Sequence, residues 1–152
     1  MNKKTFIGIL ICILIGGVSA IFLYKNYKTE DIANVLEKKV YFVQVGAFKN
    51  YDNVIEITKT LPNYLIINEK NLYIIYVGIS KEEDNIKKLN KIYNEKGFNT
   101  FVKSKKISNE KFLTLIEKYD LLLQRTNEKD MILNINKEVL KLYKEQVYEK
   151  LN

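Results

Sequence analysis

Hydrophobic and polar residues alternate along two short segments of the chain. Residues 41–48 read YFVQVGAF and residues 73–78 read YIIYVG, and both place β-branched residues at every second position. This period of two is typical of β-strands that bury one face. Gly46 and Gly78 stand near the ends of the segments, where we expect them to let the backbone turn out of the strand toward a helix. The two segments therefore predict two copies of one β-α unit.

Two segments between and after these strands follow a helical period instead. The apolar residues that recur at helical spacing are Val54, Ile57 and Leu61 in the first segment and Ile86, Leu89, Ile92 and Tyr93 in the second. The first of these helices is expected between Asn50 and Pro62. Ser80 and Glu83 have the spacing of a capping box at the start of the second, and Gly97 stands where that helix stops.

Two further strands complete the predicted unit. Residues 64–69 and 72–77 flank a Lys70-Asn71 turn and predict a hairpin, and residues 99–103 predict a last strand. The order is then strand, helix, strand, strand, helix, strand. This order is typical of an α+β fold of the ferredoxin or RNP type, in which a four-stranded antiparallel sheet carries both helices on one face.

Alternation assigns the side chains of the two central strands to opposite faces of this sheet. The residues expected to point toward the helices are Val43, Val45, Tyr73, Ile75 and Val77. Phe42, Gln44, Ile74 and Tyr76 then occupy the other face, and Phe48 is expected in the core. A solvated sheet face is normally polar, so an apolar and aromatic face predicts that something covers it.

Residues 39–106 resemble the SPOR (sporulation-related repeat) domain, whose two halves typically read Y-x-V-Q-V-G-x-F and Y-R-V-x-V-G-P-F. The first half of this sequence matches at Tyr41, Val43 to Gly46 and Phe48, whereas Ile74, Ile79 and Ser80 depart from the second pattern. The resemblance implies a domain that binds bacterial cell-wall glycan strands lacking stem peptides. It also implies a setting in wall remodelling at cell division or sporulation.

Three occupants compete for the apolar sheet face. A glycan would stack its sugars on Phe42 and Tyr76, beside Ile74, while Gln44 donated and accepted hydrogen bonds. A second occupant is the chain itself, through its C-terminal segment. The third, RNA, stacks its bases on aromatics of the same strands in RNA-recognition motifs, but the third strand lacks the signature of that family.

The C-terminal segment, residues 107–152, predicts two amphipathic helices. Their apolar residues are Phe112, Leu115, Ile116, Tyr119 and Leu123 in the first and Ile132, Ile135, Val139, Tyr143 and Val147 in the second. The polar residues 125–130 separate them. These helices are expected to cover the sheet or to pair with each other, with a partner protein or with another copy of the chain, and we favour pairing.

Residues 5–24 carry no charge and follow Lys3 and Lys4, which predicts a membrane anchor over residues 1–24. Val18-Ser19-Ala20 also fits the cleavage site of a secretory signal peptide, and this alternative stays open. Residues 25–38 read as a juxtamembrane linker with a short helix. Both alternatives place the following domain outside the cytoplasm, and an anchor would make the chain a single-pass protein of the cell membrane, with the division septum as one site.

The composition argues against an enzyme. The chain contains no histidine and a single cysteine, Cys12, so the usual zinc ligands and Ser-His or Cys-His pairs are missing, and we expect no metal site and no cofactor. The formal net charge is +7, but positive and negative residues are interleaved without a long lysine block, which disfavours a nucleic-acid partner.

The sequence therefore predicts a non-catalytic, membrane-anchored protein that binds peptidoglycan glycan strands. Phe42, Gln44, Ile74 and Tyr76 are its predicted contacts, and Gly46, Gly78, Phe48 and Ser80 have structural roles. The alternative is an extracytoplasmic interaction scaffold whose own C-terminal helices cover the sheet, and which binds a membrane or division protein.

Overall fold

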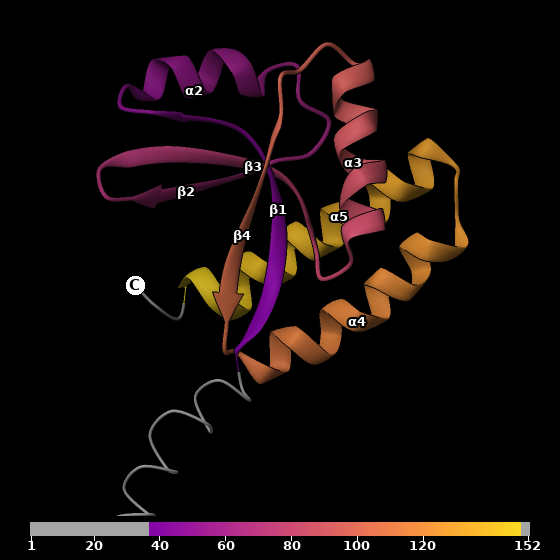
Figure 1. Cartoon of the computed structure of the whole chain (residues 1–152). Helices are drawn as coiled ribbons and strands as arrows, with labels where there is room; N and C mark the ends of the chain where they lie inside the picture. The colour runs from indigo at the N-terminus through magenta and orange to yellow at the C-terminus, as the bar shows by residue number, and fades with distance from the viewer. Residues whose placement is uncertain (1–36, 150–152) are drawn as a thin grey trace, which may run out of the picture. The chain divides into compact units, whose positions relative to one another are not determined.

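The computed structural model describes residues 37–149 of the chain. Their elements follow in the order β1 (Lys38–Phe48), α2 (Tyr51–Thr58), β2 (Leu65–Glu69), β3 (Leu72–Ser80), α3 (Glu83–Glu95), β4 (Phe101–Ile107), α4 (Glu110–Arg125), α5 (Lys129–Tyr143) and η1 (Lys144–Tyr148). Figure 1 shows the strands with α2 and α3, and a hairpin of the two C-terminal helices. The α+β class and the C-terminal helical extension are both confirmed.

The strands form one antiparallel sheet in the order β2-β3-β1-β4. Both central strands are those predicted from the two alternating segments, and they are longer than predicted. Lys70 and Asn71 join β2 to β3 with φ angles of 52° and 62°. Two consecutive positive φ angles are typical of the type I′ turn, whose twist matches that of a two-residue hairpin. The predicted hairpin is confirmed.

Helices α2 and α3 pack on one face of the sheet. Buried residues of both helices, Val54 in α2 and Ile86, Leu89, Ile92 and Tyr93 in α3, form a cluster with Val43, Ile75 and Val77 of the central strands. Val45 and Tyr73 pack against the same cluster. The predicted inward face is therefore confirmed. Gly97, with φ of +88°, follows α3 as predicted.

The C-terminal helices cover the opposite face. Val139, Leu140 and Tyr143 of α5 and Val147 of η1 share a cluster with sheet residues. Phe112, Leu113 and Ile116 of α4 belong to the same cluster. Helices α4 and α5 also pack against each other (Figure 1). The expectation that pairing would leave the sheet open is wrong, because the apolar stripe of α5 is buried on the sheet.

The roles predicted for three structural residues need correction. Gly46 and Gly78 lie inside β1 and β3, and neither ends a strand. A Cβ at Gly78 would lie 3.1 Å from Val43 and 3.2 Å from Leu89, so this glycine allows α3 to approach the sheet closely. At Gly46 a Cβ would collide with the ring of Phe48, which is half-buried against the helix-side cluster.

Ser80 is not the N-cap of α3. The strand continues through Ser80, and Glu82 occupies the cap position without a side-chain hydrogen bond. The Ser80 hydroxyl oxygen instead accepts from the backbone N–H of Glu82 at 2.9 Å. The capping box fails because Ser80 is fully buried and bonds to the C-terminal helices.

The predicted anchor and most of the linker lie outside the described residues. Within residues 37–149, no helix combines the length and the hydropathy that a membrane span requires.

Candidate functional site

The structure brings the four predicted glycan contacts onto one face but leaves only two of them accessible. Phe42 is fully buried and Tyr76 is 1 % exposed. Gln44 and Ile74 are half-buried. The expectation of an open aromatic face is therefore wrong for Phe42 and Tyr76, because their rings are core side chains.

Helix α5 is what covers these rings. The ring of Tyr143 packs edge-on to Phe42 with centroids 5.1 Å apart, and to Phe112 of α4 at 5.4 Å. Phe42 in turn lies 4.9 Å from Tyr76. Such edge and tilted contacts are favourable beyond the apolar area they bury. Burial raises the pKa of Tyr143 to about 12.

Lys105 closes the same face from its edge strand. Its ammonium group lies over the rings of Tyr76 at 5.2 Å and Phe42 at 5.6 Å, and 2.5 Å from the carboxylate of Glu69. Burial alone would lower the pKa of Lys105, but hydrogen bonding to Glu69 and Tyr76 raises it overall. The charge is thus held by two aromatic faces and one carboxylate.

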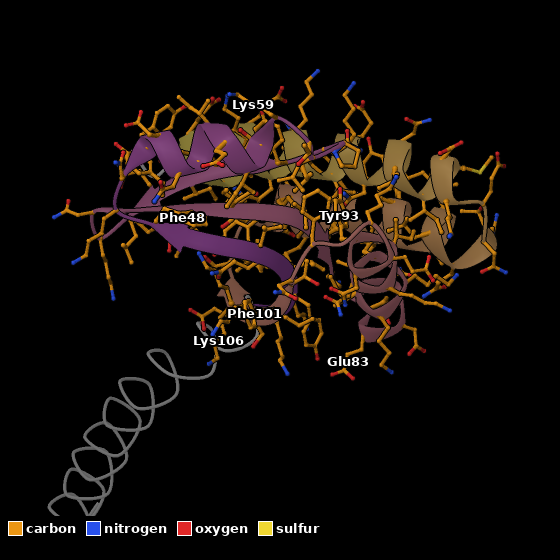
Figure 2. The ribbon with its side chains drawn as sticks, turned by 90° about the horizontal axis from the view of Figure 1, so that it is seen from above. Phe48, Lys59, Glu83, Tyr93, Phe101 and Lys106 are labelled. Atoms are coloured by element: carbon orange, nitrogen blue, oxygen red, sulfur yellow. The ribbon has the colours of Figure 1, made fainter. Side chains whose placement is uncertain are left out.

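The accessible part of the face lies at the other end of β4. Phe101 pairs with Gln44 across the two strands, so both side chains start on the same side of the sheet. Phe101 is 59 % exposed, the most exposed large apolar side chain of the described residues. In Figure 2, Phe101 lies at the margin of the molecule, whereas Tyr93 lies among interior side chains.

A polar groove continues from Phe101 along the loop between α3 and β4. It has a volume of about 510 Å³, and we call it the amide groove, lined by Asn94, Gly97, Phe98, Asn99, Thr100 and Phe101. The Thr100 hydroxyl lies 2.6 Å from the side-chain oxygens of both Asn90 and Asn94. A hydroxyl has one hydrogen to donate, so these amides retain hydrogen-bonding capacity for a ligand.

Sequence reasoning missed Phe101 and the amide groove. The run Phe98-Asn99-Thr100-Phe101 contained the signal, because two aromatics flank two small polar residues at a strand start. The predicted strand 99–103 placed these residues inside the sheet. The strand begins two residues later, at Phe101, and the residues before it become an accessible loop.

A buried carboxylate holds α4 against the start of α3. Asp120 is 3 % exposed, and its carboxylate accepts from the Ser80 hydroxyl, from the Lys81 backbone N–H at 3.0 Å and from the Asn85 amide at 3.1 Å. Burial raises the pKa of Asp120 although these hydrogen bonds oppose the rise. With every oxygen engaged inside the protein, this group acts as a structural connection.

No protein-family model matches the chain. No curated protein matches it either. A solved structure, the solution structure of the peptidoglycan binding domain of the B. subtilis cell wall lytic enzyme CwlC, is similar with 25% sequence identity and a TM-score of 0.39. The similarity covers 45% of this chain and 91% of that domain.

Proposed function

We propose that residues 37–149 form a non-catalytic module that binds the glycan strands of peptidoglycan, and that the ligand lies along Phe101, Gln44 and the amide groove. The main observation behind this proposal is that the exposed ring of Phe101 on the edge strand lies beside Gln44 and a groove lined by asparagines. Sugars offer apolar ring faces for stacking and hydroxyls for amide hydrogen bonds.

Further support comes from the segment YFVQVGAF, which resembles the first SPOR repeat and forms the central strand β1. Gln44 belongs to this segment and stays half-buried, within reach of solvent. The SPOR resemblance implied a ligand on the sheet face that carries Phe42 and Tyr76. Because α5 covers these two rings, the ligand would instead lie on the accessible part of that face, toward β4. A preference for strands lacking stem peptides follows from the resemblance alone.

A co-sedimentation assay tests this proposal. A chain that starts at Lys25 is mixed with peptidoglycan, and the fraction that pellets with it is measured. Pelleting with amidase-treated peptidoglycan, which lacks stem peptides, should exceed pelleting with intact peptidoglycan. Phe101→Ala should reduce it, whereas Val102→Ala on the next residue should leave it unchanged. Equal pelleting of wild type and Phe101→Ala would contradict the proposed site, and equal pelleting with both glycans would contradict the preference.

A second candidate is an interaction scaffold that binds a membrane or division protein. The cover of the sheet by α5 favours it, because Phe42 and Tyr76 are then unavailable to any ligand. Leu121, Leu122 and Met131, each about half exposed near the turn between α4 and α5, would supply the contact. A scaffold would bind its protein partner without pelleting with either form of peptidoglycan.

A further inference from the structure

A second groove lies between α5 and the loop that joins α2 to β2, away from the residues assigned to glycan. Its helical wall carries Lys137, Lys141 and Lys144, and its loop wall carries Asn63 and Tyr64. We call it the lysine groove. It has a volume of about 330 Å³, and no aspartate or glutamate of residues 37–149 lines it.

The three lysines lie on one side of the helix because they are spaced by four and three residues. Lys137 has no ion pair among the described residues. The partners of the other two are exposed acids outside the groove, Glu145 at 4.0 Å from Lys141 and Glu149 at 3.6 Å from Lys144. Like charges at this spacing repel each other, so an anion in the groove would relieve an unfavourable arrangement.

The spacing of the charges indicates what kind of anion would fit. Lys137 and Lys144 are seven residues apart, which corresponds to about 10 Å along the helix at the helical rise. One small anion does not span that distance, whereas successive phosphates of an ester chain do. Ammonium groups bind phosphate oxygens as point charges with three donors each. Buried Leu65 and Leu140 and the half-exposed ring of Tyr64 offer an apolar surface to the carbon atoms between phosphates.

We propose that the lysine groove binds glycerol phosphodiesters through Lys137, Lys141 and Lys144. Rows of such phosphodiesters occur along soluble glycerol-phosphate polymers and among neighbouring phosphatidylglycerol headgroups at a lipid surface. Binding here is independent of the glycan site, because the groove shares no residue with Phe101, Gln44 or the amide groove.

The experiment uses the full chain in a nonionic detergent, titrated with a glycerol-phosphate oligomer and, in a separate arm, with phosphatidylglycerol in mixed micelles. Binding is followed by backbone NMR shifts of residues 62–65 and 137–144. The triple variant Lys137→Gln, Lys141→Gln, Lys144→Gln should bind about tenfold more weakly or worse, as expected from the loss of three exposed charges. The arm in which wild type binds identifies the source of the phosphodiester.

The matched control removes the same charge elsewhere, with Lys96→Gln, Lys111→Gln and Lys118→Gln, all exposed and outside the groove. It should change the affinity less than twofold. An equal loss in both triple variants would show a general charge effect and overturn the proposal, as would the absence of binding in both arms.

Thermal unfolding separates a binding defect from misfolding. The lysine-groove variant should be about as stable as wild type, because its substitutions remove like-charge repulsion along with two exposed ion pairs, and each effect is small. Its pelleting with peptidoglycan should be unchanged, so failure of the glycan proposal and failure of this one are distinguishable. A variant that unfolds below wild type is replaced by the single change Lys137→Gln, whose ammonium makes no ion pair within residues 37–149. Unchanged affinity in that variant would also overturn the proposal.

Discussion

The ammonium nitrogen of Lys105 in β4 lies 2.5 Å from a carboxylate oxygen of Glu69 in β2, so one ion pair joins the two edge strands of the sheet. Between them the lysine side chain crosses the rings of Phe42 and Tyr76. The pair lies on the face that α5 covers, and Lys105 adds to the cover over Phe42 and Tyr76. One helix and one long side chain thus bury these two rings, while Gln44 and Phe101 on the same face stay accessible.

Substitutions at Lys105 should separate its charge from its packing. Lys105→Met keeps an apolar stem over the rings and should cost about 1 kcal/mol or less, because Glu69 is 40% exposed and the pair is partly screened. Lys105→Ala should cost more, since the rings also lose their cover. Urea denaturation of both variants measures the difference. Equal losses would mean that the stem contributes nothing.

Alkaline pH should destabilise the fold. Burial raises the pKa of Tyr143 from 10.0 to about 12, so between these values the folded state keeps a proton that the unfolded state has lost. Stability from this group is complete below pH 10 and is lost as the pH rises to about 12, on the order of 3 kcal/mol in total. The raised pKa values of Tyr76 and Lys105 act in the same direction.

Tyr143→Phe tests this assignment. The variant keeps the ring contacts with Phe42 and Phe112 but has no proton to lose. Its stability should therefore fall less steeply between pH 10 and 12 than that of wild type, in urea denaturation at several pH values. Identical slopes would show that Tyr143 ionises as easily in the folded state as in the unfolded one.

Asp120 should give the fold a second pH dependence at acidic pH. Because its folded pKa is raised, the folded state binds the proton more tightly than the unfolded state. The favourable contribution is present below the unfolded pKa, near 3.8, and is lost as the pH rises through the folded pKa. Asp120→Asn should lack this dependence, and its stability relative to wild type should rise with pH over that interval.

Removing the Asp120 side chain is expected to be much more damaging. Asp120→Ala removes the acceptor of the Lys81 N–H and one of two acceptors of the Ser80 hydroxyl and the Asn85 amide, which keep the backbone carbonyls of Glu82 and residue 120. The loss of three buried hydrogen bonds, with one donor left unpaired, should lower the free energy of unfolding by about 2 to 4 kcal/mol. Chemical denaturation at pH 7 measures it. A loss under 1 kcal/mol would indicate that water replaces the carboxylate.

Substitutions at Phe101 and Phe42, on the same face of the sheet, should have opposite effects on glycan binding and on stability. Phe101→Ala should weaken glycan binding by about 1 to 3 kcal/mol, by analogy with aromatic stacking platforms, and leave stability unchanged because the ring is exposed. Phe42→Ala should instead lower stability by about 3 to 5 kcal/mol, because its ring is fully buried. Co-sedimentation and urea denaturation of both variants check the contrast.

Periodicity was sufficient to predict the sheet, because strands with a buried face alternate and their connecting helices do not. It identified which residues of β1 and β3 share a face, including Val43 with Ile75, and it placed the helices of the C-terminal extension. It also indicated that the second face needed a cover. These features depend on residues close together in the chain.

The occupant of that face could not be predicted, because it depends on contacts between distant residues. Phe42 contacts Tyr143, about a hundred residues further along the chain. The local sequence pattern around an aromatic strand residue is the same whether a sugar or a helix covers its ring. Ser80 illustrates the same limit. Its spacing to Glu83 suggested a cap, whereas its actual partner is Asp120 in α4.

A chain that ends at Ile107 tests whether α5 blocks a glycan site on the sheet. The deletion exposes Phe42, Ile79 and Tyr76, so solubility and stability should fall and binding of a hydrophobic dye should rise. Because we place the glycan at Phe101 and the amide groove, the fraction that remains folded should bind glycan with unchanged affinity. Light scattering and a glycan titration, run together on the truncated chain and on one that continues to Asn152, measure both effects. A clear gain in affinity on truncation would move the site back to Phe42 and Tyr76 and make α5 a cover that the glycan must displace.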